Sequence, residues 1–226
     1  TAQWESIRAS GAIPYISWLP GADQFPRFQE ARSLAQDSFL LTAIIDGRFD
    51  FYLRAFGERV HATGEPVFVR FAPNPGRPSN TWSISGGNCP QDYRNAWEYV
   101  VGYFTRQGID NLVWVFETDE PTSYTDYLPR AAFVHWISLH ETNDWDMLQK
   151  HRNILDLLSA YKRKPMLVHG KAVSSEALTV LPDRFSMVRG FMSDYLLKEN
   201  ITALGGSNDF WEGPPSGNAQ KSLISK

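Results

Sequence analysis

The feature that most constrains the fold of this chain is an alternation of short, nearly continuous apolar runs with longer segments of helical period. Continuous apolar runs of this length are typical of parallel strands that are buried on both faces. Seven such runs predict strands: Ala12–Trp18, Phe39–Ile45, Pro66–Phe71, Asn111–Phe116, Phe133–Leu139, Pro165–His169 and Ile201–Gly205.

Longer segments between these runs predict helices, several of them with recognisable start and stop residues. In one of them Tyr93, Trp97 and Phe104 fall on one helical face, which we expect to pack on a sheet. A repeated strand–helix order is typical of a (β/α) barrel or a doubly wound sheet. Because no glycine-rich phosphate loop is present, we predict an α/β fold of the (β/α)8 TIM-barrel type. The predicted helices are Asp23–Gln36, Gly47–Ala62, Pro90–Gln107, Trp145–Tyr161 and Pro182–Lys198.

The chain length bears on the completeness of that barrel. The sequence has 226 residues and seven predicted strands, one fewer than a closed eight-stranded barrel needs. We therefore expect one domain over residues 1–226, with a first strand upstream of the chain or an incomplete barrel, and with other domains of a longer protein as neighbours.

Charge and composition exclude several classes of function. Lys and Arg number 22 against 25 Asp and Glu, a net charge of −3, so the basic footprint of a nucleic-acid-binding domain is absent. No apolar run approaches the roughly 18 residues of a membrane-spanning helix. The single cysteine, Cys89, allows no internal disulfide, and no His, Asp and Cys residues have metal-ligand spacing. We expect no metal and no cofactor.

The residues directly after the predicted strands are the candidates for function, because active sites of barrels lie at the carboxyl ends of the strands. Aromatic rings pack on the C–H faces of sugars, and carboxylates and amides bind hydroxyl groups, so an acidic and aromatic rim indicates a carbohydrate ligand. The rim consists of Trp18, Asp46, Pro73, Asn74, Glu117, Asp119, His140, Glu141, His169 and residues 208–211.

Several segments, taken in order, resemble motifs of glycoside hydrolase family 26. They are Ile44–Asp50, Pro66–Phe71, Asp92–Trp97, Asn111–Phe116, Tyr127–Pro129, Val134–Ile137 and Lys164–Leu167. This resemblance implies a (β/α) barrel related chiefly to β-mannanases, with some glucanases and xylanases. It also implies a retaining mechanism that uses two glutamates.

The departures from the family pattern fall on those two glutamates. Counting from Arg70, the position of the acid/base is occupied by Asn74. Counting from Pro165, the position of the nucleophile falls on Gly170. A retaining mechanism needs one carboxyl group to protonate the leaving oxygen and another to attack the sugar. An amide cannot cycle a proton near neutral pH, and glycine has no side chain, so the resemblance implies a degenerate site.

Two functional hypotheses follow. The first is a pseudo-glycosidase that binds or handles a β-linked polysaccharide, such as mannan or glucan, without cleaving it, as a module of a larger biosynthetic or cell-surface protein. A glycan partner favours an extracytoplasmic location. The residues expected to contact the glycan are Trp18, Arg70, Asn74, Trp82, Trp114, Trp136, His140, His169, Asp209 and Trp211.

The second hypothesis is an active endo-β-glycosidase with relocated carboxylates, Glu117 and Glu141. Their separation would decide the stereochemistry, since about 5 Å suits a retaining pair and roughly 6.5 to 9.5 Å an inverting pair. This hypothesis requires both carboxylates to face the ligand rather than to form salt bridges with Arg70 or His140.

Overall fold

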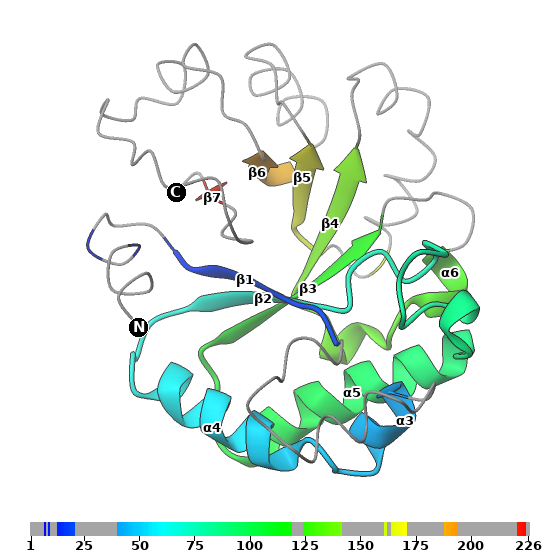
Figure 1. Ribbon diagram of the computed structural model, residues 1–226. Helices are drawn as coiled ribbons and strands as arrows, with labels where there is room; N and C mark the ends of the chain where they lie inside the picture. The colour runs from blue at the N-terminus through cyan, green and yellow to red at the C-terminus, as the bar shows by residue number, and fades with distance from the viewer. Residues whose placement is uncertain are drawn as a thin grey trace. The chain divides into compact units, whose positions relative to one another are not determined.

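The computed structural model describes residues 7, 9, 13–20, 40–118, 124–141, 161, 164–170, 188–193 and 221–224 (Figure 1). The chain forms two compact units, Ser17–His135 and Thr1–Ile16 with Trp136–Lys226. The single domain over residues 1–226 stays a prediction. Three predicted segments lie outside the described residues: Asp23–Gln36, Trp145–Tyr161 except for Tyr161, and Ile201–Gly205.

The first unit is a strand–helix alternation. Strands β2 and β3 pair in parallel, with Val67 opposite Leu112, and the end of β1 lies beside β2. Four of the predicted segments form elements close to their expected bounds: Gly47–Ala62, Pro66–Phe71, Pro90–Gln107 and Asn111–Phe116. The elements are β1 (Tyr15–Trp18), α3 (Leu40–Ile45), α4 (Asp50–His61), β2 (Val67–Phe71), the 3-10 turn η2 (Ile84–Gly86), α5 (Pro90–Arg106), β3 (Leu112–Thr118), α6 (Tyr124–Tyr127) and the 3-10 turn η3 (Ala131–Phe133).

Helix α5 begins and ends where the sequence predicts. Pro90 occupies the first helical turn, where its missing N–H costs nothing, and the Asp92 carboxylate accepts a hydrogen bond from the Cys89 N–H at 2.8 Å. The chain leaves the helix at Gly108, which has a φ of 70°. These local signals fix the position of the helix that carries Trp97 and its buried aromatic neighbours Tyr93 and Phe104.

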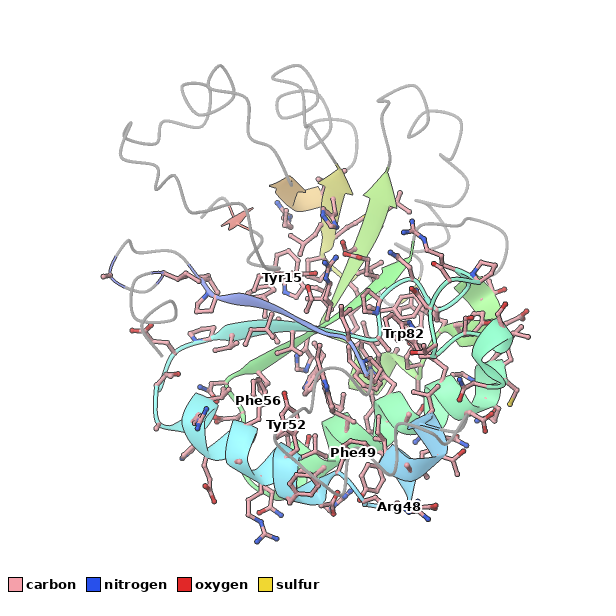
Figure 2. The ribbon with its side chains drawn as sticks, viewed as in Figure 1. Tyr15, Arg48, Phe49, Tyr52, Phe56 and Trp82 are labelled. Atoms are coloured by element: carbon pink, nitrogen blue, oxygen red, sulfur yellow. The ribbon has the colours of Figure 1, made fainter. Side chains whose placement is uncertain are left out.

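An aromatic core joins α4 and α5 to the strands. Trp97 lies at its centre and contacts the rings of Phe71 on β2 and Phe116 on β3, with centroids 6.0 and 5.9 Å away. Tyr52 and Phe56 project from α4 toward the strands and stack on each other (Figure 2). Burial of rings of this size supplies much of the apolar area that holds helices on a sheet.

The predicted strand Phe39–Ile45 is wrong, because Leu40–Ile45 forms helix α3. Leu41, Ala43 and Ile44 are buried while Thr42 is exposed, and α3 packs beside α5. A short apolar run has no period that distinguishes a buried strand from a buried helix, so the tertiary contact decides its conformation. As a consequence Asp46, expected at a strand end, is an exposed residue that follows a helix.

The second unit contains β4 (Trp136–Glu141), β5 (Met166–Gly170), β6 (Val188–Ser193) and β7 (Lys221–Ile224). Strands β4, β5 and β6 pair in parallel, and β7 pairs antiparallel with β6. The predicted helix Pro182–Lys198 is therefore wrong over residues 188–193. The β-ladder to β5 satisfies the backbone of this segment, and such pairing overrides its weak helical period. Strand β7 was not predicted.

Within the part of the chain that the structure describes, no helix is both long enough and apolar enough to span a bilayer.

Tyr99 links α5 to the start of α4, and its ionisation makes the free energy of unfolding vary with pH in the alkaline range. Its hydroxyl donates to Asp50 Oδ1 at 2.8 Å. Burial, followed by this hydrogen bond, raises the pKa of Tyr99 from 10 to about 12. The folded state therefore keeps a proton that the unfolded chain releases, so the stabilisation is complete below pH 10 and is lost as the pH rises toward 12.

We expect the Tyr99→Phe variant to lose less stability than the parent between pH 10 and pH 11.5. Urea unfolding at several pH values measures this difference, and the other tyrosines cancel because both proteins carry them. Parallel curves for the two proteins over this range would contradict the assignment.

Candidate functional site

A polar cluster lies at the carboxyl ends of the first three strands. The Arg70 Nη1 donates to Glu117 Oε1 at 2.5 Å, and the Arg70 Nε donates to Ser17 Oγ at 2.6 Å. Arg70 is 8% exposed and Glu117 1%. Strands β1, β2 and β3 thus each contribute one side chain to a buried, charge-assisted network.

The alternation of side chains along each strand explains how these three groups meet. On β2, Phe71 packs against Tyr93 and Trp97 of α5, so the adjacent Arg70 faces away from the helices. On β3, Phe116 packs on Trp97 in the same way, and Glu117 therefore faces away as well. Because parallel strands end at the same edge, the guanidinium and the carboxylate come together there.

The backbone that follows β2 is held against its neighbours in an uncommon conformation. Ala72 and Asn74 have φ values of 46° and 53°, in the left-handed region that L-residues rarely adopt. The Ala72 N–H donates to the Trp18 carbonyl, and the Asn74 N–H donates to the Glu117 carbonyl at 3.1 Å. Backbone strain of this kind persists only where surrounding contacts impose it, and it is concentrated at functional sites.

The loop over residues 75–89 folds back on this segment. Asn80 Nδ2 donates to the carbonyls of Pro73 and Asn74, and Trp82 Nε1 donates to the Pro73 carbonyl at 3.0 Å. Figure 2 shows Trp82 in this loop, and its ring is buried. Trp82 therefore fixes the loop, with its indole N–H already engaged by the protein.

Tight backbone packing continues at Gly86 in the same loop. A Cβ built at Gly86 would lie 1.9 Å from the Thr81 carbonyl oxygen, closer than any real contact, so this position requires glycine. Asn88 closes the loop from its other end by donating to the Thr81 carbonyl at 2.9 Å. The loop is thus rigidly attached to the strand ends.

Two of the tryptophans expected to contact sugar lie on the opposite side of the strands. Trp18 packs against Phe71 and Tyr52, with ring centroids 4.8 and 5.6 Å away. Trp114 is 2% exposed and packs against Phe104 and Trp97. Both rings belong to the layer between strands and helices, so the expectation that they line a sugar site is corrected. The physical reason is the two-residue period of a strand.

Trp136 lies at the start of a strand in the second unit. It is the first residue of β4, at the end of the strand opposite to the one where Glu141 lies. The six residues of β4 extend about 16 to 20 Å at the usual rise per residue. Trp136 thus begins β4 at the end away from the carboxyl-end residues, and its contact with a sugar stays a prediction.

The second unit presents its own strand ends. The register of β4 and β5 pairs His140 with His169, and Glu141 with Gly170. The His169 side chain is buried. Gly170, which the family resemblance places at the nucleophile position, ends β5 without any side chain. Asp119, Asp209 and Trp211 lie outside the described residues.

Tyr93 is a neighbour of the cluster that the sequence assigned only to the core. Its hydroxyl donates to the Phe71 carbonyl at 3.4 Å. Burial first, and then the negative charge of Glu117 and the nearby Tyr127, raise the pKa of Tyr93 well above its ordinary value of 10. Tyr93 therefore stays neutral near pH 7 and does not serve as a base.

Sequence reasoning missed Ser17, which lies next to the more conspicuous Trp18. The alternation of faces along β1 could have found it, because a helix-facing Trp18 implies that Ser17 faces the site. Among the described residues, no group of three or more His, Cys, Asp and Glu side chains is arranged to hold a metal ion. The chemistry available at the cluster is hydrogen bonding by one buried guanidinium, one carboxylate and neighbouring polar groups.

Comparison with solved structures identifies the fold. The catalytic domain of the Bacillus sp. JAMB-750 GH26 endo-β-1,4-mannanase superimposes with a TM-score of 0.55 at 14% identity, over 74% of this chain and 49% of that one. GH26C from Muricauda sp. MAR_2010_75 gives a TM-score of 0.59 at 15% identity, over 83% and 61%.

A third structure is the β-mannanase from a symbiotic protist of the termite Reticulitermes speratus, complexed with a gluco-manno-oligosaccharide. It gives a TM-score of 0.53 at 16% identity, over 93% of this chain and 62% of that one. The chain therefore spans about half to three fifths of the length of these structures. No protein-family model matches the chain, and no curated protein matches it either.

These comparisons confirm the predicted α/β fold of the family 26 barrel type. The identities of 14 to 16% establish similarity of fold and do not extend to the reaction.

Proposed function

We propose that this chain, which has the fold of family 26 β-mannanases, binds a β-linked polysaccharide of the mannan or glucan type and does not hydrolyse it. The observation that carries the proposal is Asn74 at the end of β2, where the family resemblance expects the catalytic acid. Its side chain is an amide, and its backbone is fixed by the bond to the Glu117 carbonyl at 3.1 Å.

In this proposal Glu117 does not take over the role of the catalytic acid, although its backbone carbonyl accepts the N–H of Asn74. A catalytic acid must exchange a proton with the substrate and with water. Glu117 is buried, and its Oε1 accepts the Arg70 guanidinium at 2.5 Å. A carboxylate oxygen that is bound by a guanidinium in this way is not available to protonate a leaving group.

The same groups suit the binding of a neutral, hydroxyl-rich ligand. Arg70 and Glu117 balance each other in charge, and Asn74 adds an amide at the same strand ends. A gluco-manno-oligosaccharide is bound by the termite protist β-mannanase, whose fold this chain shares. Because a polysaccharide ligand favours it, we also propose an extracytoplasmic location, as part of a larger protein.

Calorimetric titration with manno-, gluco- and xylo-oligosaccharides tests the proposal. We expect saturable binding of at least one series, together with no release of reducing ends from the matching polysaccharide on prolonged incubation. The Glu117→Gln variant tests the alternative hypothesis of relocated carboxylates. That hypothesis requires the parent to cleave the polysaccharide and the Glu117→Gln variant to have lost this cleavage. Cleavage by the parent protein, or the absence of binding to all three series, would refute the proposal.

A further inference from the structure

We propose that Glu117 is a positioning residue, which holds the Arg70 guanidinium in the orientation that binds the glycan, with Ser17 as the second support. This inference rests on the proposed function. It assigns Glu117 a role that acts through Arg70, in place of the catalytic role that the relocated-carboxylate hypothesis gives it.

The contacts of Arg70 define the orientation of a planar group. Glu117 Oε1 accepts from Nη1 at 2.5 Å, and Ser17 Oγ accepts from Nε at 2.6 Å. Two bonds to different nitrogens of a rigid guanidinium fix both its plane and its rotation within that plane. An arginine side chain has several rotatable bonds, and without these supports it would lose conformational entropy when it bound a ligand.

Glu117 also supports the backbone beside Arg70. Its carbonyl accepts the N–H of Asn74, whose φ of 53° places it in the left-handed region. The side chain of Glu117 thus holds the guanidinium, while its main chain holds the strained residue that follows β2. One residue of β3 fixes both polar groups that β2 brings to the strand ends.

Stability does not account for this ion pair. Desolvation of two charges offsets most of their attraction, so a buried pair of well-packed apolar side chains is often as stable. The parallel pairing of β2 with β3 and the packing of α5 hold these strands together independently of Arg70. A charged pair at this edge is therefore best explained by what the guanidinium binds.

A surface ion pair of the same unit provides a matched control. Glu98 on α5 pairs with Arg130, whose Nε donates to Glu98 Oε2 at 2.8 Å. The Arg130 side chain is 72% exposed. Glu98→Gln removes the same charge as Glu117→Gln, but on helix α5 and outside the strand-end cluster.

The test measures glycan affinity in a double-mutant cycle on the full chain, using the oligosaccharide series that the parent binds. Arg70→Gln is expected to weaken binding by about tenfold or more, since hydrogen bonds to charged groups are of that strength. Glu117→Gln and Ser17→Ala should weaken binding by smaller factors. The Arg70→Gln, Glu117→Gln double variant should bind no more weakly than Arg70→Gln alone, and Glu98→Gln should bind as the parent does.

Parent-like affinity of Glu117→Gln, or full additivity of its effect with that of Arg70→Gln, would overturn the positioning role and leave the proposed function intact. A parent that binds no glycan would overturn both. Should Glu117→Gln fail to fold, as judged by circular dichroism, Ser17→Ala decides the matter. Its weakened affinity must vanish in the Arg70→Gln background, and parent-like affinity of Ser17→Ala would refute the proposal.

Discussion

The Trp97→Ala variant is expected to lose about 3 to 5 kcal/mol of unfolding free energy, the usual cost of removing a large aromatic side chain from a core. Trp97 is fully buried and contacts Phe71 on β2, Phe116 on β3 and Tyr93 on α5 itself. Truncation leaves a cavity between the helix and the strands that the surrounding rings cannot fill. Urea unfolding monitored by circular dichroism measures the loss.

A conservative variant separates packing from hydrogen bonding at the same position. Trp97 Nε1 donates to the Phe133 carbonyl at 2.8 Å, and Trp97→Phe removes this donor while keeping most of the apolar volume. We expect Trp97→Phe to cost about 1 to 3 kcal/mol, as for a partly buried carbonyl left without its donor. If Trp97→Ala cost no more than Trp97→Phe, the cavity argument would fail.

Breaking the buried ion pair from one side is expected to have an effect of similar size. Glu117→Leu leaves the Arg70 guanidinium buried without its counter-ion, which typically costs about 3 to 5 kcal/mol. The double variant Arg70→Met, Glu117→Leu should recover most of the lost unfolding free energy, because two apolar side chains have no charge to desolvate. Denaturant unfolding of the two single variants and the double variant measures the coupling between them.

The exposed pair Arg130–Glu98 is again the control for this cycle. Glu98→Leu should leave the unfolding free energy close to that of the parent, as is typical of exposed salt bridges. A double variant at Arg70 and Glu117 that is as unstable as the sum of its single variants would contradict the interpretation, since it would mean that the two charges act independently.

Elements with a strong local signal were predicted within a few residues. Helix α5 has a proline at its first turn, a glycine just after its end and an aromatic stripe at helical spacing, and each of these signals is local in the sequence. Strands β2 and β3 were predicted because continuous apolar runs end at turn residues. The same rule failed for α3, where six apolar and small residues fit either conformation.

Prediction of the site was partial for a related reason. The position of a residue at a strand end follows from the chain order, and Arg70, Asn74 and Glu117 are indeed found there. The face on which a side chain lies depends on which residue of the strand meets the helices. Trp18 and Trp114 were assigned to the wrong face, since residue type alone does not reveal that contact.

The sequence by itself determined the aromatic face of α5 and most of the strand–helix order, because these depend on residue identity and local spacing. The family resemblance aligned Asn74 and Gly170 with the positions of the two glutamates, and the loss of those glutamates stays part of the proposal. Only the tertiary structure decided that Glu117 binds Arg70, that Ser17 supports it and that Trp18 and Trp114 pack on the helices. Ser17 and Arg70 are 53 residues apart along the chain, and Arg70 and Glu117 are 47 residues apart. Only the side-by-side arrangement of β1, β2 and β3 in the sheet brings such distant groups within hydrogen-bonding distance.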